Sequence, residues 1–204
     1  MSIFEYNGAA VVAMAGKECV AIGSDLRFGV QLQTMATDVP KVYPIHPRLY
    51  LGLAGLQSDS TTLLQKLVFK HNMYRLREER DMRPETFGWL VSATLYEKRF
   101  GPFFASPVVA GLEADNTPFV CGMDSIGALE TAKDFIVAGT APESLFGMCE
   151  SMWRPDLGPD ELFEVLGQCL LAGVDRDALS GWGAVVHVIT PDAVISRQLK
   201  GRMD

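Results

Sequence analysis

The feature that most constrains the fold is a set of short apolar runs in which hydrophobic and polar residues do not alternate. Runs of this kind occupy 9–15, 19–24 and 49–55 early in the chain. A strand with one face in water alternates between apolar and polar residues, so these strands need cover on both faces. Four later segments share the pattern, namely 107–112, 119–123, 135–139 and 184–190.

Helical patterns separate these runs, and they come in two pairs. The first helix is predicted over 58–79, with Ser58 as its N-cap residue. The second follows Arg83, since proline suits the first helical position, where Pro84 stands. The later pair is predicted over 141–153 and 160–173. The apolar stripes of the first pair are Leu64, Leu67, Val68 and His71, then Phe87, Leu90, Val91, Thr94 and Leu95.

The order of these elements predicts the architecture. Further short strands are predicted at 30–35, 41–43 and 194–199, and 135–139 is grouped with the strands just before it. Strands and helices in separate groups favour an α+β fold over strict alternation. We predict a four-layer αββα sandwich, with two stacked antiparallel sheets flanked by helix pairs. The whole of 1–204 is expected to form one domain, with 1–8 as a short extension.

Composition narrows the classes of partner. Of 204 residues, 48% are apolar and 21% are charged, which favours a well-filled core. The formal net charge is −7 and no run of Lys or Arg occurs, so we expect neither nucleic acid nor membrane as a partner. The N-terminus lacks the pattern of a signal peptide. A soluble chain of the cytoplasm and nucleus is expected.

The cysteines and histidines show no pattern of a metal site. Four cysteines occur without Cys-x-x-Cys spacing, and buried reduced thiols are the expected interpretation. Three histidines lie far apart, without a His-Glu-x-x-His motif. No glycine-rich loop suits a phosphate group. We therefore expect no metal and no cofactor.

Four short motifs share an order and spacing that are specific only when taken together. They are Gly-Ser-Asp-Leu-Arg at 23–27, Asp-Val-Pro-Lys-Val at 38–42, Leu-Ala-Gly at 53–55 and Asp-Ala-Leu-Ser-Gly at 177–181. With the element order, they resemble the proteasome family of N-terminal-nucleophile hydrolases over essentially the whole chain. The segments 96–102 and 147–151, with both ends of the chain, resemble one β subtype in particular.

The resemblance implies a known set of catalytic parts. In active members, self-cleavage after a glycine frees a threonine whose hydroxyl is the nucleophile and whose own α-amine is the base. An α-amine suits this role because its unperturbed pKa of roughly 7.7–8 lies near neutral pH. By resemblance, Asp25 and Lys41 correspond to the family's aspartate and lysine, and Gly55 to the oxyanion glycine. Asp177 and Ser180 correspond to the late segment that closes the site.

Two positions depart from that set. Ungapped counting from Asp25 and Lys41 places Ala9 at the threonine position, directly after Gly8. An alanine has no hydroxyl, so neither self-cleavage nor attack on a substrate is expected there. The family's site serine is expected at Ala138. We therefore predict that these positions are vestigial, that Asp25 and Lys41 form a buried structural ion pair, and that 1–8 stay attached.

The resulting hypothesis is a structural subunit of the 20S β ring, without catalytic residues of its own. By resemblance it would contact type-2 and type-4 β neighbours, β subunits of the opposite ring and α-ring subunits, and regulatory particles only indirectly. One alternative is an active hydrolase with a displaced nucleophile, which predicts a mature N-terminus at Thr, Ser or Cys. The other is a free-standing binding module, which predicts a soluble monomer.

Overall fold

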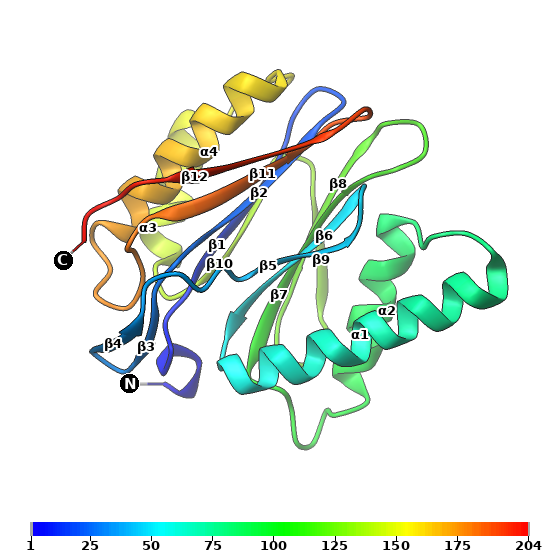
Figure 1. The fold of residues 1–204 in the computed structure, drawn as a ribbon, viewed down its shortest axis with the longest axis horizontal. Helices are drawn as coiled ribbons and strands as arrows, with labels where there is room; N and C mark the ends of the chain where they lie inside the picture. The colour runs from blue at the N-terminus through cyan, green and yellow to red at the C-terminus, as the bar shows by residue number, and fades with distance from the viewer. Residues whose placement is uncertain (1, 204) are drawn as a thin grey trace.

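The computed structural model describes residues 2–203 and shows two antiparallel sheets stacked face to face between two pairs of helices (Figure 1). The first sheet has the strand order β10-β1-β2-β11-β12. Its hairpin β1–β2 is buried along its whole length, as the unbroken apolar runs predict. The strands are β10 (Phe135–Gly139), β1 (Ala10–Ala15), β2 (Val20–Asp25), β11 (Ala184–Ile189) and β12 (Val194–Leu199).

The second sheet has the order β5-β6-β7-β8-β9, and a small separate hairpin, β3–β4, stands beside the sandwich. The central strand β6 is buried at all positions. The strands of the sheet are β5 (Val42–His46), β6 (Leu49–Gly55), β7 (Ala105–Leu112), β8 (Pro118–Met123) and β9 (Leu129–Ala132). The hairpin comprises β3 (Phe28–Val30) and β4 (Gln33–Ala36).

Each sheet carries one helix pair on its outer face (Figure 1). The helices α1 (Gln57–Glu78) and α2 (Pro84–Tyr96) cover the second sheet, and α3 (Pro142–Met152) and α4 (Pro159–Val174) cover the first. A short 3₁₀ helix, η1 (Ile3–Glu5), precedes β1. Three apolar clusters fill the spaces between the four layers. The predicted αββα architecture is therefore confirmed.

The assignment of one strand to its sheet needs correction. The sequence grouped 135–139 with the strands before it, but β10 crosses to the first sheet and pairs with β1, where Gly139 lies opposite Ala10. The place beside β8 is taken by β9, which was not predicted. This strand is only four residues long and its central Glu130 and Thr131 are exposed, so it carries no apolar run.

The start of α1 also differs from the prediction. Ser58 lies inside the first turn, and Leu56 is the N-cap residue without a capping side chain of its own. The cap comes from far away in sequence, because the Oδ1 atom of Asn7 accepts a hydrogen bond from the N–H of Gln57 at 2.9 Å. The buried face is also rotated, since it is centred on Ser60, Leu63, Leu67 and His71 and only flanked by Leu64 and Val68.

The four cysteines are buried free thiols. Burial raises the pKa of Cys19 to about 11 and that of Cys121 to about 12. Because the thiolate is the reactive form, we expect iodoacetamide at pH 8 to leave both residues unlabelled in the native protein and to label them fully in denaturant. Mass spectrometry of digested samples measures this, and rapid labelling of the native chain would contradict it.

Candidate functional site

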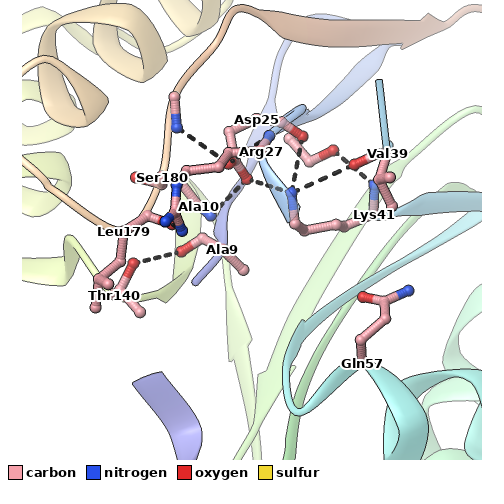
Figure 2. A network of polar contacts seen from close by, with 12 residues as sticks. Ala9, Ala10, Asp25, Arg27, Val39, Lys41, Gln57, Thr140, Leu179 and Ser180 are labelled. Atoms are coloured by element: carbon pink, nitrogen blue, oxygen red, sulfur yellow. Dashed lines mark hydrogen bonds and ion pairs between the residues drawn. The ribbon is translucent and has the colours of Figure 1, made fainter. Parts of the chain in front are cut away.

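The candidate site lies at the start of β1, where Ala9 leads into the strand (Figure 2). Ala9 is only 2% exposed and packs in the cluster between the two sheets. Its carbonyl oxygen accepts a hydrogen bond from the N–H of Thr140 at 2.7 Å and lies 3.1 Å from the hydroxyl oxygen of the same residue. The next residue, Ala10, donates its N–H to the Oδ1 atom of Asp25 at 2.9 Å. The backbone at position 9 is thus held from two sides.

A buried ion pair lies beside this backbone. The Nζ atom of Lys41, just before β5, is 2.8 Å from Oδ1 of Asp25 at the end of β2. The ammonium also donates to the carbonyl oxygens of Asp25 and Val39, at 3.2 and 3.3 Å. Both side chains are shielded from solvent, as Asp25 is 0% and Lys41 1% exposed. The structure therefore brings these two residues together as a closed pair.

Backbone donors complete the surroundings of the carboxylate. The Oδ2 atom of Asp25 accepts from the N–H groups of Arg27 and Gly181, at 3.2 and 3.1 Å. Burial raises the pKa of the Asp25 carboxyl and lowers the pKa of Lys41, while the opposite charge of the partner acts against burial in both cases. A charge pair so enclosed is stable only while both partners are present, because either charge alone would be left uncompensated.

The late segment of the chain joins the same cluster. The Oδ2 atom of Asp177 accepts hydrogen bonds from the hydroxyls of Thr140 and Ser180, at 2.5 and 2.6 Å. The loop Gly181–Gly183 that follows has positive φ at three successive residues and carries Trp182 over the guanidinium of Arg27. Asp177 and Ser180 are therefore tied to Ala9 through a single residue, Thr140.

The structure places Ala138, the residue predicted at the position of the family's site serine, away from the polar contacts of this cluster. Ala138 is on β10 opposite Val11 and packs against the cluster between the sheets. The hydroxyl that contacts both the backbone of Ala9 and Asp177 belongs to Thr140, two residues later. Position 138 therefore removes no polar group from this cluster, because Thr140 supplies one. The correspondence of Ala138 with the family's serine stays a prediction, and the sequence signal for the hydroxyl of this cluster was Thr140 next to Gly139.

Two glycines have a conformation that other residues rarely adopt. Gly55 ends β6 with φ of 113°, and a Cβ there would lie 2.3 Å from the carbonyl oxygen of Phe104. Gly8 has φ of 73°, and its Cβ would lie 1.7 Å from the carbonyl oxygen of Leu179. Close approach of two backbones therefore requires glycine at both positions. Gly8 brings the segment before Ala9 into contact with the loop before β11.

Hydrogen bonds of Tyr6 and Asn7 hold the segment before Ala9 against neighbouring parts of the chain. The carbonyl oxygens of Tyr6 and Asn7 accept from the N–H groups of Gln31 and Gly29, at 2.7 and 3.2 Å. The side chain of Asn7 donates to the carbonyl of Gly29 at 2.9 Å and accepts from Gln57. Sequence reasoning missed Asn7, because no local pattern shows that its partners lie on β3 and α1.

Arg27 fixes the loops around the same cluster. Its side chain is 0% exposed and donates to Thr34, the carbonyl of Leu179 and the carbonyl of Gln31, at 3.0, 2.8 and 3.1 Å. The guanidinium thereby joins the nearby hairpin β3–β4, which carries Gln31 and Thr34, to the distant loop at Leu179. The motif that suggested Asp25 contained Arg27, but its role as a bridge is visible only in the structure.

Replacing Asn7 with alanine should loosen the N-terminal segment. The change leaves the carbonyl of Gly29 and the N–H of Gln57 without their side-chain partners, so we expect a loss of about 1–3 kcal/mol in the free energy of unfolding. Asn7→Asp is the comparison variant, since it keeps the acceptor at the start of α1, loses the donor to Gly29 and adds a negative charge there. Hydrogen exchange at residues 2–8 measures the effect, and equal protection in Asn7→Ala and the original chain would contradict the prediction.

The described residues were also searched for a metal-binding group and for a membrane-spanning helix. Across residues 2–203, no group of three or more His, Cys, Asp and Glu side chains is placed to hold a metal ion. Over the same residues, no helix combines the length and apolar character needed to cross a bilayer.

The αββα sandwich is the fold of the N-terminal-nucleophile hydrolase class, and in this chain a buried Asp–Lys pair lies beside the start of its inner strand β1. Ala9, the residue predicted to stand at the nucleophile position, has a methyl side chain, and its nitrogen is bonded to Gly8. The sequence pattern of the family described as "Proteasome subunit" matches residues 5–189, and the chain belongs to the proteasome family.

Relatives from several kingdoms resemble the chain over its full length. "Proteasome subunit beta type-3-B" of Arabidopsis thaliana is 65% identical over 204 residues, and "Proteasome subunit beta type-3" of Picea mariana is 64% identical over 204 residues. "Proteasome subunit beta type-3" of Drosophila melanogaster is 54% identical over 205 residues. In each case the alignment covers 100% of both chains. This subtype matches the one that segments 96–102 and 147–151 resemble.

Proposed function

We propose that this chain is a type-3 subunit of the proteasome core that completes the β ring without cutting peptide bonds itself. The observation that carries the proposal is the chemistry at Ala9, where a methyl group stands at the nucleophile position. Its full-length similarity to β type-3 subunits supports the ring position.

Three features of the site support the absence of catalysis. Catalysis by an N-terminal nucleophile needs a hydroxyl or thiol at the first residue next to a base, and Ala9 supplies neither. The nitrogen of Ala9 lies in a peptide bond with Gly8, so it has no lone pair that accepts a proton at neutral pH. Ala9 is 2% and Lys41 1% exposed, so a substrate cannot reach them unless residues 6–8 move. The remaining polar groups of the site form an ion pair and hydrogen bonds with one another.

The retained Asp25–Lys41 pair then has a structural role. It joins β2 to the start of β5 and, through Ala10 and Gly181, holds β1 and the loop before β11. These four segments come from both sheets and from both ends of the chain. The catalytic geometry of the family thus supports the sandwich in a chain that performs no chemistry there.

The partners we propose are the other subunits of the core. Contacts with type-2 and type-4 β neighbours, the opposite β ring and the α ring follow from the ring position, and we propose the cytoplasm and nucleus as the location. Large exposed apolar side chains support extensive contacts, because side chains of this kind are enriched at interfaces. They include Leu32, Met35, Phe69, Leu76, Trp89 and Phe100.

The test combines intact mass with a threonine-directed covalent inhibitor on the purified particle. We expect this chain to retain residues before Gly8 and to gain no inhibitor, while active subunits of the same particle gain it and serve as the internal control. A chain that begins at an internal Thr, Ser or Cys, or one that carries the inhibitor, would establish the alternative of a displaced nucleophile.

A further inference from the structure

A second cluster of polar side chains lies between the second sheet and its helices, where the link between α1 and α2 passes the turn from β5 to β6 (Figure 1). The rings of His46, at the end of β5, and His71, in α1, are stacked with their centroids 5.7 Å apart and their planes at 20°. His71 is only 2% exposed and His46 is half-buried. The candidate site described above contributes no residue to this cluster.

Two hydrogen bonds fix His46 in its neutral form. Its Nε2 atom lies 2.9 Å from the carbonyl oxygen of Met82, so this nitrogen carries the ring hydrogen. Its Nδ1 atom accepts the backbone N–H of Arg48 at 3.2 Å, which requires a lone pair on that nitrogen. An added proton would set two N–H groups against each other at Nδ1. A protonated His46 would have to turn towards another acceptor, and turning would give up the bond to Met82.

His71 has one charged neighbour and one nitrogen without a partner. Its Nε2 atom is 3.3 Å from Oδ1 of Asp81 in the α1–α2 link. Within the described residues, its buried Nδ1 atom has no hydrogen-bond partner, so a proton added there would have no acceptor. The ring of Phe87 in α2 packs edge-on against His71, with centroids 6.4 Å apart. Charging His71 in this enclosed place therefore has a cost, which Asp81 only partly offsets.

The charges around the two rings can compensate one added proton but not two. Asp81 is the acid in contact with the rings. The positive charge of Arg48 opposes protonation of His46, and that of Arg75 opposes protonation of His71. Two imidazolium rings at this spacing would also repel each other. The other charged groups on the surrounding elements are Arg83 in the link, Glu85 at the start of α2, and Glu113 and Asp115 in the turn between β7 and β8.

The enclosure of the rings makes the cluster sensitive to acid. Burial lowers the pKa of both histidines, while the Met82 carbonyl and Asp81 act against this at His46 and Asp81 does so at His71. An opened cluster would return both rings to the ordinary histidine pKa of about 6.5, so opening takes up protons below that pH. The contacts are therefore fully effective above about pH 6.5 and weaken as the pH falls towards the lowered pKa values.

From this geometry we propose that His46 and His71 form an acid-sensitive latch, which holds the α1–α2 link against β5 while both rings are neutral and releases it when both are protonated. The released segment comprises the link and the first turn of α2, residues 79–87. Its release opens to solvent the pocket of about 420 Å³ between the link and the turn from β5 to β6. The first sheet and its helices contribute no residue to the latch and stay folded. The device is independent of the proposed function.

Hydrogen exchange of the full-length chain at two pH values tests the latch. The amide of Arg48 donates to His46, and the amide of Phe87 donates to the carbonyl of Arg83 at 2.9 Å, so they report on the two sides of the latch. Between about pH 7.5 and about pH 5.5, their protection factors should fall about 100-fold, since each ring that takes up a proton contributes about tenfold. Protection factors are already corrected for the intrinsic effect of pH on exchange. Unchanged protection at these amides would overturn the proposal.

Variants assign the effect to the two rings. His46→Gln replaces the ring by an amide that does not titrate, and should reduce the fall at Phe87 to about tenfold. Adding His71→Phe should abolish it. His187→Gln is the matched control, because His187 is also half-buried and its pKa is also lowered by burial, but it lies on β11 of the first sheet. A full fall in the double variant, or its loss in His187→Gln, would show that other groups sense the acid.

Two further measurements keep the test independent of how the variants fold. The amide of Leu162, in the first turn of α4, should keep its protection, because local opening there moves neither histidine, and an equal fall at Leu162 would indicate general loosening in place of a latch. In an NMR titration of the unaltered chain, the ring signals of His46 and His71 should remain those of neutral rings below about pH 6.5 and then change together with the signals of Phe87. Titration of both rings near that pH without a change at Phe87 would overturn the proposal.

Discussion

Replacing Asp25 with asparagine lowers the free energy of unfolding by about 3–5 kcal/mol, because it leaves the Lys41 ammonium buried without its counter-charge. Asparagine is close to aspartate in shape, so the loss reports charge and hydrogen bonding, and packing changes little. The ammonium would keep neutral acceptors, namely the carbonyl oxygens of residue 25 and Val39 and the amide oxygen of the new asparagine, but no negative charge. Urea unfolding followed by tryptophan fluorescence measures the difference.

A double-mutant cycle separates the pair from its surroundings. Adding Lys41→Met removes the uncompensated charge. The loss of unfolding free energy in the double variant should therefore be several-fold smaller than the sum of the losses in the two single variants. The exposed pair of Lys66 and Glu97 is the control, and Glu97→Gln should cost less than about 1 kcal/mol since solvent screens its charge. Additive effects of Asp25→Asn and Lys41→Met would refute a coupled pair.

Replacing Gly139 with alanine destabilises the protein by at least about 3 kcal/mol, because the residue meets backbone and has a left-handed conformation. Its φ is 126°, and a Cβ would lie 2.0 Å from the carbonyl oxygen of Ala9. The adjoining Thr140 also donates to that oxygen, so the strain falls on the junction of β10 and β1. Urea unfolding and the protection of Thr140 against hydrogen exchange measure the effect.

Gly147 provides a matched control with the opposite expected sign. It lies within α3 and a Cβ there would meet nothing within 4 Å. Alanine at this place should stabilise the protein by about 0.5–1 kcal/mol, since it favours the helix and restricts the unfolded chain. Similar effects at both glycines would mean that the contact at Gly139 does not determine its cost.

Local sequence patterns were sufficient to predict those strands and helices whose burial depends on residues close together in the chain. The unbroken apolar runs predicted β1, β2 and β6 as strands covered on both faces, and the structure buries each of them completely. The stripe of α2 was predicted with only Leu90 less buried than expected. Such signals arise from periods of two and 3.6 residues, which neighbours in sequence are enough to define.

These local patterns could not predict which strands and side chains pair when they are far apart in the chain. The choice of sheet for β10 and the existence of β9 depend on which edges are free once the other strands have paired. The hydroxyl beside Ala9 comes from Thr140, which is 131 residues away, so no local pattern could show this contact. The capping of α1 by Asn7 spans 50 residues and has no local signature.

The sequence by itself determined the α+β layering and the absence of a hydroxyl at position 9, because both depend on which residues are present and on their local spacing. Only the tertiary structure decided that Asp25 and Lys41 are sealed from water, that Thr140 joins Ala9 to Asp177, and that Asn7 closes the start of α1. These arrangements depend on the packing of segments from distant parts of the chain, and packing is a property of the folded molecule.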